Sequence, residues 1–100
     1  MNQYKFYVYM TTNPQRTVLY TGMTNDLVRR MEEHSQNRDN LETFAGKYHC
    51  HNLVYWEFYQ YVNRAIAREK EIKGWRREKK IELINSFNPE WRFLNNEIQD

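Results

Sequence analysis

The N-terminal quarter of the chain alternates between runs of aromatic or β-branched residues and short polar breaks. Residues 4–10 are rich in tyrosine, phenylalanine and valine, a composition typical of a β-strand. Residues 11–16 contain Asn13-Pro14 and predict a turn. Residues 17–23 then predict a second strand that pairs with the first as an antiparallel hairpin. Gly22, near the end of this strand, indicates a bulge or a close approach of another group to the backbone.

A helix is predicted after the hairpin, because apolar residues now recur at helical spacing. Asn25 or Asp26 can cap its N-terminus, and we expect it to end at about His34 or Ser35. Its apolar stripe comprises Leu27, Val28 and Met31. Residues 36–50 are polar and aperiodic, so they predict a long loop with room for one short helical turn.

The second half of the chain predicts one further strand and two helices. Residues 52–59 are apolar at both alternating sets of positions, which predicts a strand covered on both faces. Residues 62–75 predict a second helix, and residues 76–87 predict a third helix that ends before Asn88-Pro89. The order strand, strand, helix, strand, helix, helix predicts an α+β fold with a small, mainly antiparallel three-stranded sheet flanked by helices.

The composition narrows the class of protein. One hundred residues predict a single domain over residues 1–100. No apolar run is long enough to span a membrane, and the N-terminus has no signal-peptide pattern. Cys50 is the single cysteine, which excludes an internal disulfide and suits a reducing cytoplasm, the location that we expect. His49-Cys50-His51 is not interpreted as a zinc site, because structural zinc needs four ligands at spaced positions.

Charge is more informative in its distribution than in its total. The net charge of +2 indicates no particular partner. Between Arg64 and Lys80, however, eight basic residues accompany only three acidic ones. Such a segment is typical either of a phosphate-binding face or of a solvated helix with Glu–Lys and Glu–Arg pairs.

One carboxylate occupies a position where the helical pattern predicts an apolar residue. Val62, Ala65 and Ile72 lie on one face of the second predicted helix, and Glu69 belongs to the same stripe. Glu71 is about 200° further round the helix and is expected to face solvent. A buried carboxylate needs a cation or strong donors. Glu69 is therefore either part of a static ion pair, with Arg30, Lys73 or another base, or a metal ligand or catalytic carboxylate in a cleft.

The N-terminal elements offer further candidate side chains. Arg30 and His34 are four residues apart and share one face of the first predicted helix. Tyr7 and Tyr9 share one face of the first strand, because side chains alternate along a strand. Tyr20 shares a face with Gly22 on the second strand. Each residue alone is more typical of a core or surface position than of a catalytic one.

Taken together, these residues resemble the GIY-YIG nuclease family, in its small stand-alone bacterial branch. Tyr7-Val8-Tyr9 corresponds to the first family motif and Tyr20-Thr21-Gly22 to the second. Arg30, ten residues beyond Tyr20, His34 one turn later and Glu69 on a later helix match the remaining site residues in order and spacing. The first motif has tyrosine in place of its glycine and the second has threonine in place of isoleucine. The late asparagine of the family has two possible matches, Asn85 and Asn88.

The resemblance implies hydrolysis of a DNA phosphodiester with one Mg²⁺ or Mn²⁺ ion. Glu69 is expected to hold the ion, and Arg30 to stabilise the developing charge. Tyr9 or Tyr20 is expected to position or deprotonate the attacking water, with His34 as an alternative base or relay. Basic side chains of the last two helices are expected to bind backbone phosphates. These side chains are Arg68, Lys73, Arg76, Arg77, Lys79 and Lys80.

Three functions from different classes are compatible with these features. The first is an endonuclease that acts in DNA repair or on branched, damaged or single-stranded DNA. The second is a nucleic-acid-binding module that keeps the fold but cleaves little. The third is a protein-interaction domain whose basic face is incidental. A carboxylate among phosphate-binding residues favours the first function, because a simple DNA binder has no use for it.

Overall fold

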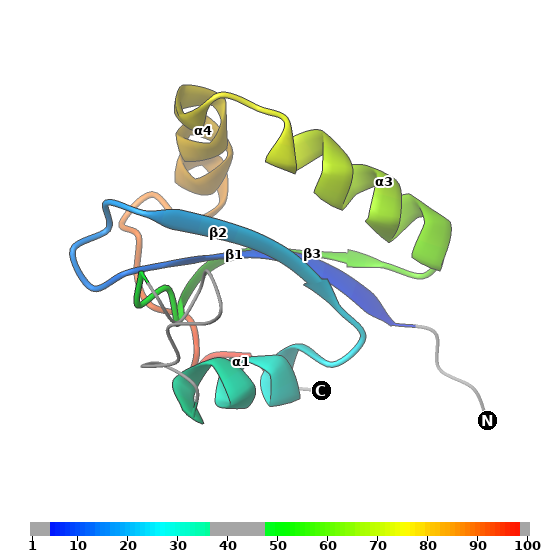
Figure 1. Ribbon diagram of the computed structural model, residues 1–100, viewed down its shortest axis with the longest axis horizontal. Helices are drawn as coiled ribbons and strands as arrows, with labels where there is room; N and C mark the ends of the chain where they lie inside the picture. Colours follow the sequence, from blue (N-terminus) through cyan, green and yellow to red (C-terminus); the bar gives the residue numbers. More distant parts are fainter. Residues whose placement is uncertain (1–4, 37–47, 99–100) are drawn as a thin grey trace.

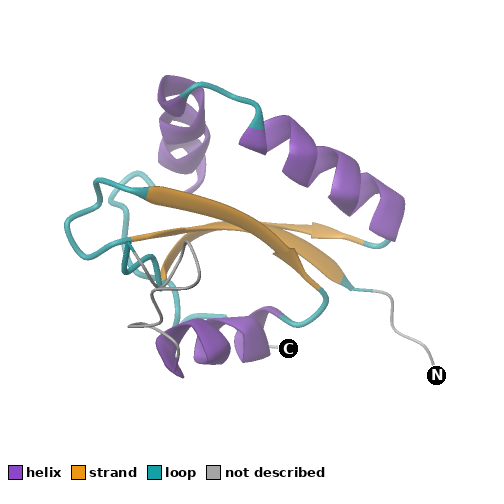
Figure 2. Ribbon diagram, in the orientation of Figure 1, coloured by secondary structure: helices purple, strands orange, loops and turns teal. Residues whose placement is uncertain are grey.

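Three antiparallel strands form the centre of the fold in the computed structural model, which describes residues 5–36 and 48–98. β1 (Phe6–Thr12) lies between β2 (Leu19–Thr24) and β3 (Asn52–Tyr59), so the strand order is β2-β1-β3. Helix α1 covers one face of the sheet, and helices α3 and α4 cover the other (Figures 1 and 2). The helix bounds are α1 Leu27–Gln36, α3 Val62–Lys73 and α4 Arg77–Phe87. The predicted α+β fold and the order β-β-α-β-α-α are confirmed.

The turn of the N-terminal hairpin lies two residues further along the chain than predicted. Thr11 and Thr12 belong to β1, because they pair with Tyr20 and Leu19 of β2. The turn covers residues 13–18, and Asn13 organises it. The Oδ1 atom of Asn13 accepts hydrogen bonds from the backbone amides of residue 17 at 2.7 Å and residue 18 at 2.9 Å. These bonds hold residues 17 and 18 in the turn, and β2 therefore begins at Leu19 rather than at residue 17.

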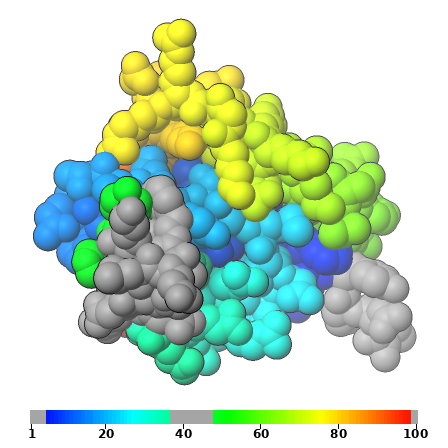
Figure 3. All heavy atoms as spheres, viewed as in Figure 1, coloured from blue at the N-terminus to red at the C-terminus, as the bar shows by residue number. Residues whose placement is uncertain are grey.

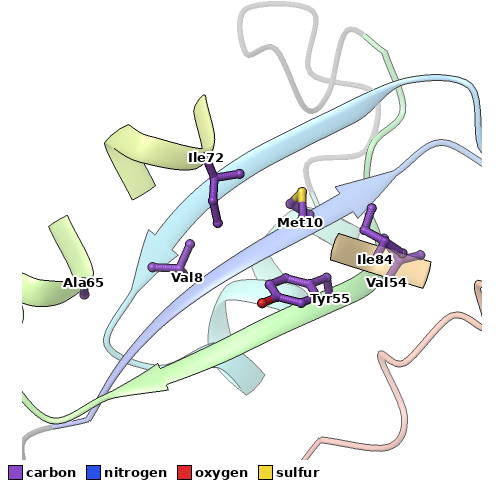
Figure 4. Close-up of a cluster of buried hydrophobic side chains, with 7 residues drawn as sticks. All are labelled: Val8, Met10, Val54, Tyr55, Ala65, Ile72 and Ile84. Carbon is purple, nitrogen blue, oxygen red and sulfur yellow. The ribbon is translucent and has the colours of Figure 1, made fainter. Parts of the chain in front are cut away.

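β3 matches its predicted bounds and is covered on both faces. Its pairing with β1 shifts between Met10 and Thr11, so Val54 and Tyr55 both pack into the same hydrophobic cluster. Seven residues form this cluster between the sheet and helices α3 and α4 (Figure 4). They are Val8, Met10, Val54, Tyr55, Ala65, Ile72 and Ile84. A second cluster, on the α1 face, comprises Tyr9, Leu27, Met31, Leu53 and Leu94.

The helices begin and end close to the predicted positions. Asp26, rather than Asn25, caps α1, because its Oδ1 accepts a hydrogen bond from the Arg29 backbone amide at 3.1 Å. One prediction for α3 is wrong: the helical spacing places Val62 in the apolar stripe, but its side chain is 44% exposed. It lies in the first turn of α3, directly after β3, and the core begins only at Ala65.

The C-terminal segment packs back on the sheet through backbone contacts. The Leu94 amide donates to the Leu53 carbonyl at 2.7 Å, and Asn95 Oδ1 accepts from the Leu53 amide at 2.9 Å. The predicted loop lies largely outside the described residues, because residues 37–47 are not among them. No helix in the described ranges is both long and apolar enough to cross a membrane.

Candidate active site

Three aromatic rings from three different elements meet on the α1 face of the sheet. Tyr9 comes from β1, Tyr20 from β2 and His34 from the last turns of α1. The Tyr9 hydroxyl is 3.1 Å from His34 Nε2. The ring centroids are 5.8 Å apart for Tyr9 and His34, 5.7 Å for Tyr20 and His34, and 6.3 Å for Tyr9 and Tyr20. The fold therefore gathers one tyrosine of each sequence motif and the histidine into one cluster.

Gly22 makes room for this cluster. It pairs with Tyr9 across the hairpin, and the phenol of Tyr9 lies over its backbone. A Cβ atom at position 22 would be 2.5 Å from the Tyr9 hydroxyl oxygen and 3.0 Å from Cε2 of Tyr20. Both distances are shorter than van der Waals contact. Of the two alternatives that the sequence left open for Gly22, the structure shows the close approach.

Gly22→Ala is expected to destabilise the fold by about 1–3 kcal/mol, because overpacking forces buried groups to shift. The Tyr9 side chain is fully buried and cannot move into solvent, so its hydrogen bond to His34 is expected to break. The melting temperature measures the first effect. The nitrogen chemical shifts of the His34 imidazole in nuclear magnetic resonance spectra measure the second.

Gly74→Ala is the matched control for this substitution. A Cβ atom at Gly74 would meet only backbone oxygens of Lys70 and Glu71, at 3.6 Å, which is ordinary contact. Its φ of −82° suits alanine, so the Gly74 variant is expected to be as stable as the native chain or slightly more stable. Equal melting temperatures for the two alanine variants would contradict the steric argument at Gly22.

Burial sets the protonation states of Tyr9 and His34. Burial first, and then the neighbouring Tyr20, raise the pKa of the Tyr9 phenol well above its usual value, and the opposing effect of Arg30 is smaller. Burial first, and then Arg30, lower the pKa of His34. His34 is therefore a neutral imidazole at pH 7 and Tyr9 a neutral phenol. In the tautomer with its proton on Nε2, His34 donates to the Tyr9 hydroxyl oxygen, and Nδ1 carries the lone pair that can accept a proton.

Arg30 lies at the solvent side of this cluster. Its side chain is 41% exposed, and its Nε is 3.4 Å from Oε1 of Glu33. Arg29 also reaches Glu33, at 3.9 Å, but is more exposed. Exposed pairs of this kind are weak and screened. The guanidinium of Arg30 can therefore exchange Glu33 for a phosphate while it still acts electrostatically on Tyr9 and His34.

Glu69 approaches the cluster from the other side of the sheet. Helix α3 lies on the face opposite to α1, and β2 is the edge strand beside both (Figure 1). The Glu69 side chain is 22% exposed, and its Oε2 is 3.3 Å from Nζ of Lys73. Its negative charge contributes to the raised pKa of Tyr9, after the larger effects of burial and Tyr20. Arg30 and Glu69 therefore both act on the same phenol, and the candidate site extends round the edge of β2.

Most of the predicted phosphate-binding residues are exposed. Arg68 is the exception, because carboxylates already bind its guanidinium and leave it unavailable for a DNA phosphate. Its guanidinium donates from Nε and Nη2 to the Glu57 carboxylate, at 2.9 to 3.2 Å, and from Nη1 to Glu71 at 3.0 Å. Tyr55 and Tyr59 also donate to Glu57. Sequence reasoning missed this network. Its only signal was a charged residue, Glu57, in an otherwise apolar strand.

The remaining basic residues lie around the junction of α3 and α4. Arg76, Arg77 and Lys79 are exposed, and the ammonium of Lys79 lies over the Trp75 ring at 4.4 Å from its centroid. The two asparagines that could match the family have structural contacts instead. Asn88 is buried and donates to the backbone oxygens of residues 54 and 92, and Asn85 accepts a hydrogen bond from Trp91.

Comparison with known proteins agrees with this geometry. Residues 5–82 match the family model described as the GIY-YIG catalytic domain, a range that includes β1, β2 and Glu69. UPF0213 proteins of Staphylococcus aureus strains Mu3 and Mu50 are each 39% identical to the chain over 66 residues, which cover 66% of this chain and 78% of each relative. No solved structure gives a significant match. The family match covers both tyrosine motifs and the helix that carries the carboxylate, and the chain therefore belongs to the GIY-YIG nuclease family.

Proposed function

We propose that the protein is a metal-dependent endonuclease that hydrolyses phosphodiester bonds of DNA. The observation that carries the proposal is the Tyr9–Tyr20–His34 cluster, in which the Tyr9 hydroxyl is 3.1 Å from His34 Nε2. Arg30, one turn before His34 on α1, and Glu69, on the opposite face of the sheet, both act electrostatically on Tyr9. A cation, a carboxylate and a neutral imidazole around one position are the groups that phosphodiester hydrolysis requires. The exposed bases of α3 and α4 add a surface for backbone phosphates.

The donor set fits one Mg²⁺ or Mn²⁺ ion. Within residues 5–36 and 48–98, no three His, Cys, Asp or Glu side chains gather closely enough to form a metal cage. A single carboxylate is nevertheless a suitable ligand, because Mg²⁺ retains several waters and binds through one or two carboxylates and the substrate phosphate. Glu69 would hold the ion. When bound, the ion supplies charge neutralisation at the phosphate and the leaving oxygen.

The proposed roles follow from burial. Arg30, exposed and able to release Glu33, stabilises the charge that develops on the phosphate. Tyr20, which is half-buried, orients the attacking water, and the neutral imidazole of His34 accepts its proton. Tyr9 has no exposed surface and a phenol that stays protonated, so it acts as a positioning residue that holds the His34 ring.

The experiment that tests the function is a cleavage assay with single-stranded, duplex and branched DNA. The native chain is expected to cut at least one of these substrates in Mg²⁺ or Mn²⁺ and to stop cutting when the metal is chelated. Preference for a branched or damaged substrate would support a role in DNA repair. DNA binding without metal-dependent cutting would favour a binding module, and no affinity for DNA at low salt would contradict both.

The pH dependence of cleavage tests the role of His34. Its lowered pKa means that the ring loses its proton below about pH 6.5, the usual value for histidine. A neutral imidazole base predicts a rate that rises through this acidic range and is then flat from pH 7 to 8. In Tyr9→Phe the hydrogen bond to His34 is lost, so this acidic limb is expected to shift. A rate that instead keeps rising tenfold per pH unit above pH 8 would indicate a tyrosine base.

A further inference from the structure

We propose that Lys73 moves between two partners: it pairs with Glu69 while no metal is bound, and it binds a backbone phosphate of the DNA, in a pocket beside Tyr20, once the metal occupies Glu69. The inference rests on the proposed function and adds to it a coupling between metal loading and DNA binding. It also defines a binding site for a second phosphate of the DNA backbone, next to the phosphate that is hydrolysed.

The first observation is the ion pair itself. Lys73 lies one helical turn after Glu69 on α3, and its Nζ is 3.3 Å from Oε2 of Glu69. The lysine side chain is 52% exposed, whereas the carboxylate is 22% exposed. Packing therefore holds the carboxylate more firmly than the ammonium. A lysine ammonium at the end of a flexible four-carbon stem can leave without a change in the backbone.

The second observation is a pocket on the other side of the same lysine. A cavity of about 280 Å³ is lined by Leu19, Tyr20, Thr21, Lys73 and Lys80. Figure 3 shows the end of α3 (yellow) next to the light-blue surface of β2. Lys73 and Lys80 line this pocket from two helices, so rotation of their flexible four-carbon stems would bring two ammonium groups over it. A phosphate monoanion of the DNA backbone is the ligand that two adjacent ammonium groups favour.

The third observation is an unsatisfied hydroxyl in the pocket wall. Thr21 is 5% exposed, and its Oγ1 has no hydrogen-bond partner in the described part of the chain. Buried polar groups normally have a partner, and one without it requires an explanation. The oxygen itself is buried, so rotation of the Thr21 side chain would be needed to bring it to the pocket surface, where a phosphate oxygen would satisfy it. The pocket thus combines charge and an unused hydrogen-bonding group next to Tyr20.

The two positions of Lys73 exclude each other, and this links the ligands. An ammonium on Glu69 competes with a divalent cation for the same carboxylate. A metal ion on Glu69 repels the ammonium towards the pocket, where a phosphate receives it. Metal and DNA therefore strengthen each other's binding, by the reciprocity that thermodynamic linkage requires.

Titration of the protein alone with Mn²⁺ tests the competition without any cleavage. Lys73→Met is expected to bind Mn²⁺ about two- to fivefold more tightly than the native chain, the range expected from loss of a partly exposed ion pair. Lys70→Met, which changes an exposed lysine on the same helix, is the matched control and should leave the affinity unchanged. An unchanged affinity in Lys73→Met, or an equal gain in both variants, would overturn the proposal.

Binding of a fluorescein-labelled DNA duplex in the presence of a chelator tests the other position. Glu69→Gln frees Lys73 and is expected to tighten DNA binding about two- to fivefold. In the double variant Glu69→Gln/Lys73→Met this gain should vanish, and Lys80→Met should lower the salt dependence by about one phosphate contact. A gain that persists in the double variant contradicts the proposal. Neither measurement requires cutting, so an inactive chain would refute the proposed function and leave these results interpretable.

Discussion

Glu69→Gln is expected to lower the rate of DNA cleavage roughly a thousandfold or more, because it removes the carboxylate that would hold the metal ion. The substitution keeps the shape of the side chain and removes its charge. It also removes the ion pair with Lys73, but this pair is half-exposed and contributes little to stability. The folded structure and the affinity for DNA are therefore expected to survive. Single-turnover cleavage in Mg²⁺ and in Mn²⁺ measures the loss.

Glu71→Gln provides the matched control on the same helix. Glu71 is two residues later, faces solvent as predicted and pairs with Arg68 at 3.0 Å rather than with Lys73. Its loss removes the same charge from α3 at a position away from the aromatic cluster, so cleavage should change less than about threefold. If both glutamine variants cleaved as fast as the native chain, Glu69 would have no part in the reaction.

Arg68→Ala is expected to lower the free energy of unfolding by about 2–3 kcal/mol and the melting temperature by roughly 10–15 °C. The guanidinium and the Glu57 carboxylate are 22% and 16% exposed and are joined by more than one hydrogen bond. Removal of the arginine leaves a largely desolvated carboxylate without its cation. Burial acts to raise the pKa of Glu57, but the hydrogen bonds from Arg68, Tyr55 and Tyr59 outweigh it and the net pKa is lowered.

The lowered pKa of Glu57 gives a second readout for the same variant. Its contribution to stability is complete above the pKa of an unfolded glutamate, about 4.3, and is lost as the pH falls through the lower pKa of the folded state. Acidification below pH 5 should therefore destabilise the native chain more steeply than Arg68→Ala. Parallel pH dependences of melting temperature would contradict this assignment.

Arg77→Ala separates stability from DNA binding. Arg77 is exposed at the start of α4, whereas Arg68 is enclosed by carboxylates. The Arg77 variant is expected to melt close to the native temperature but to bind DNA more weakly, with a smaller salt dependence. Arg68→Ala should show the reverse. This contrast would separate Arg68 from the other bases of its segment, which sequence alone treats as equivalent.

Sequence alone determined most of the secondary structure, because hydrophobic spacing is a local property. The apolar runs of residues 52–59 and the helical spacing of Ala65 and Ile72 correspond directly to β3 and to the buried face of α3. A family resemblance specified the order and spacing of the candidate site residues. It identified the two tyrosine motifs, Arg30, His34 and Glu69. The strand boundaries at Thr12 and Leu19 could not be predicted from the sequence, because strand pairing and the Asn13 side chain decide where the turn begins.

Only the tertiary structure decided what each charged or polar side chain contacts. Arg68 and Lys73 are both basic residues of one helix, yet Arg68 is held by more than one hydrogen bond to Glu57 of β3, whereas the half-exposed Lys73 pairs with Glu69. Tyr9 and Tyr20 are both motif tyrosines, yet burial keeps the first away from solvent and leaves the second at the edge of a pocket. Local sequence carries hydrophobic periodicity, whereas desolvation and ion pairing depend on residues that are distant in the chain. The chemistry of the site therefore follows from the packing of β2 between α1 and α3.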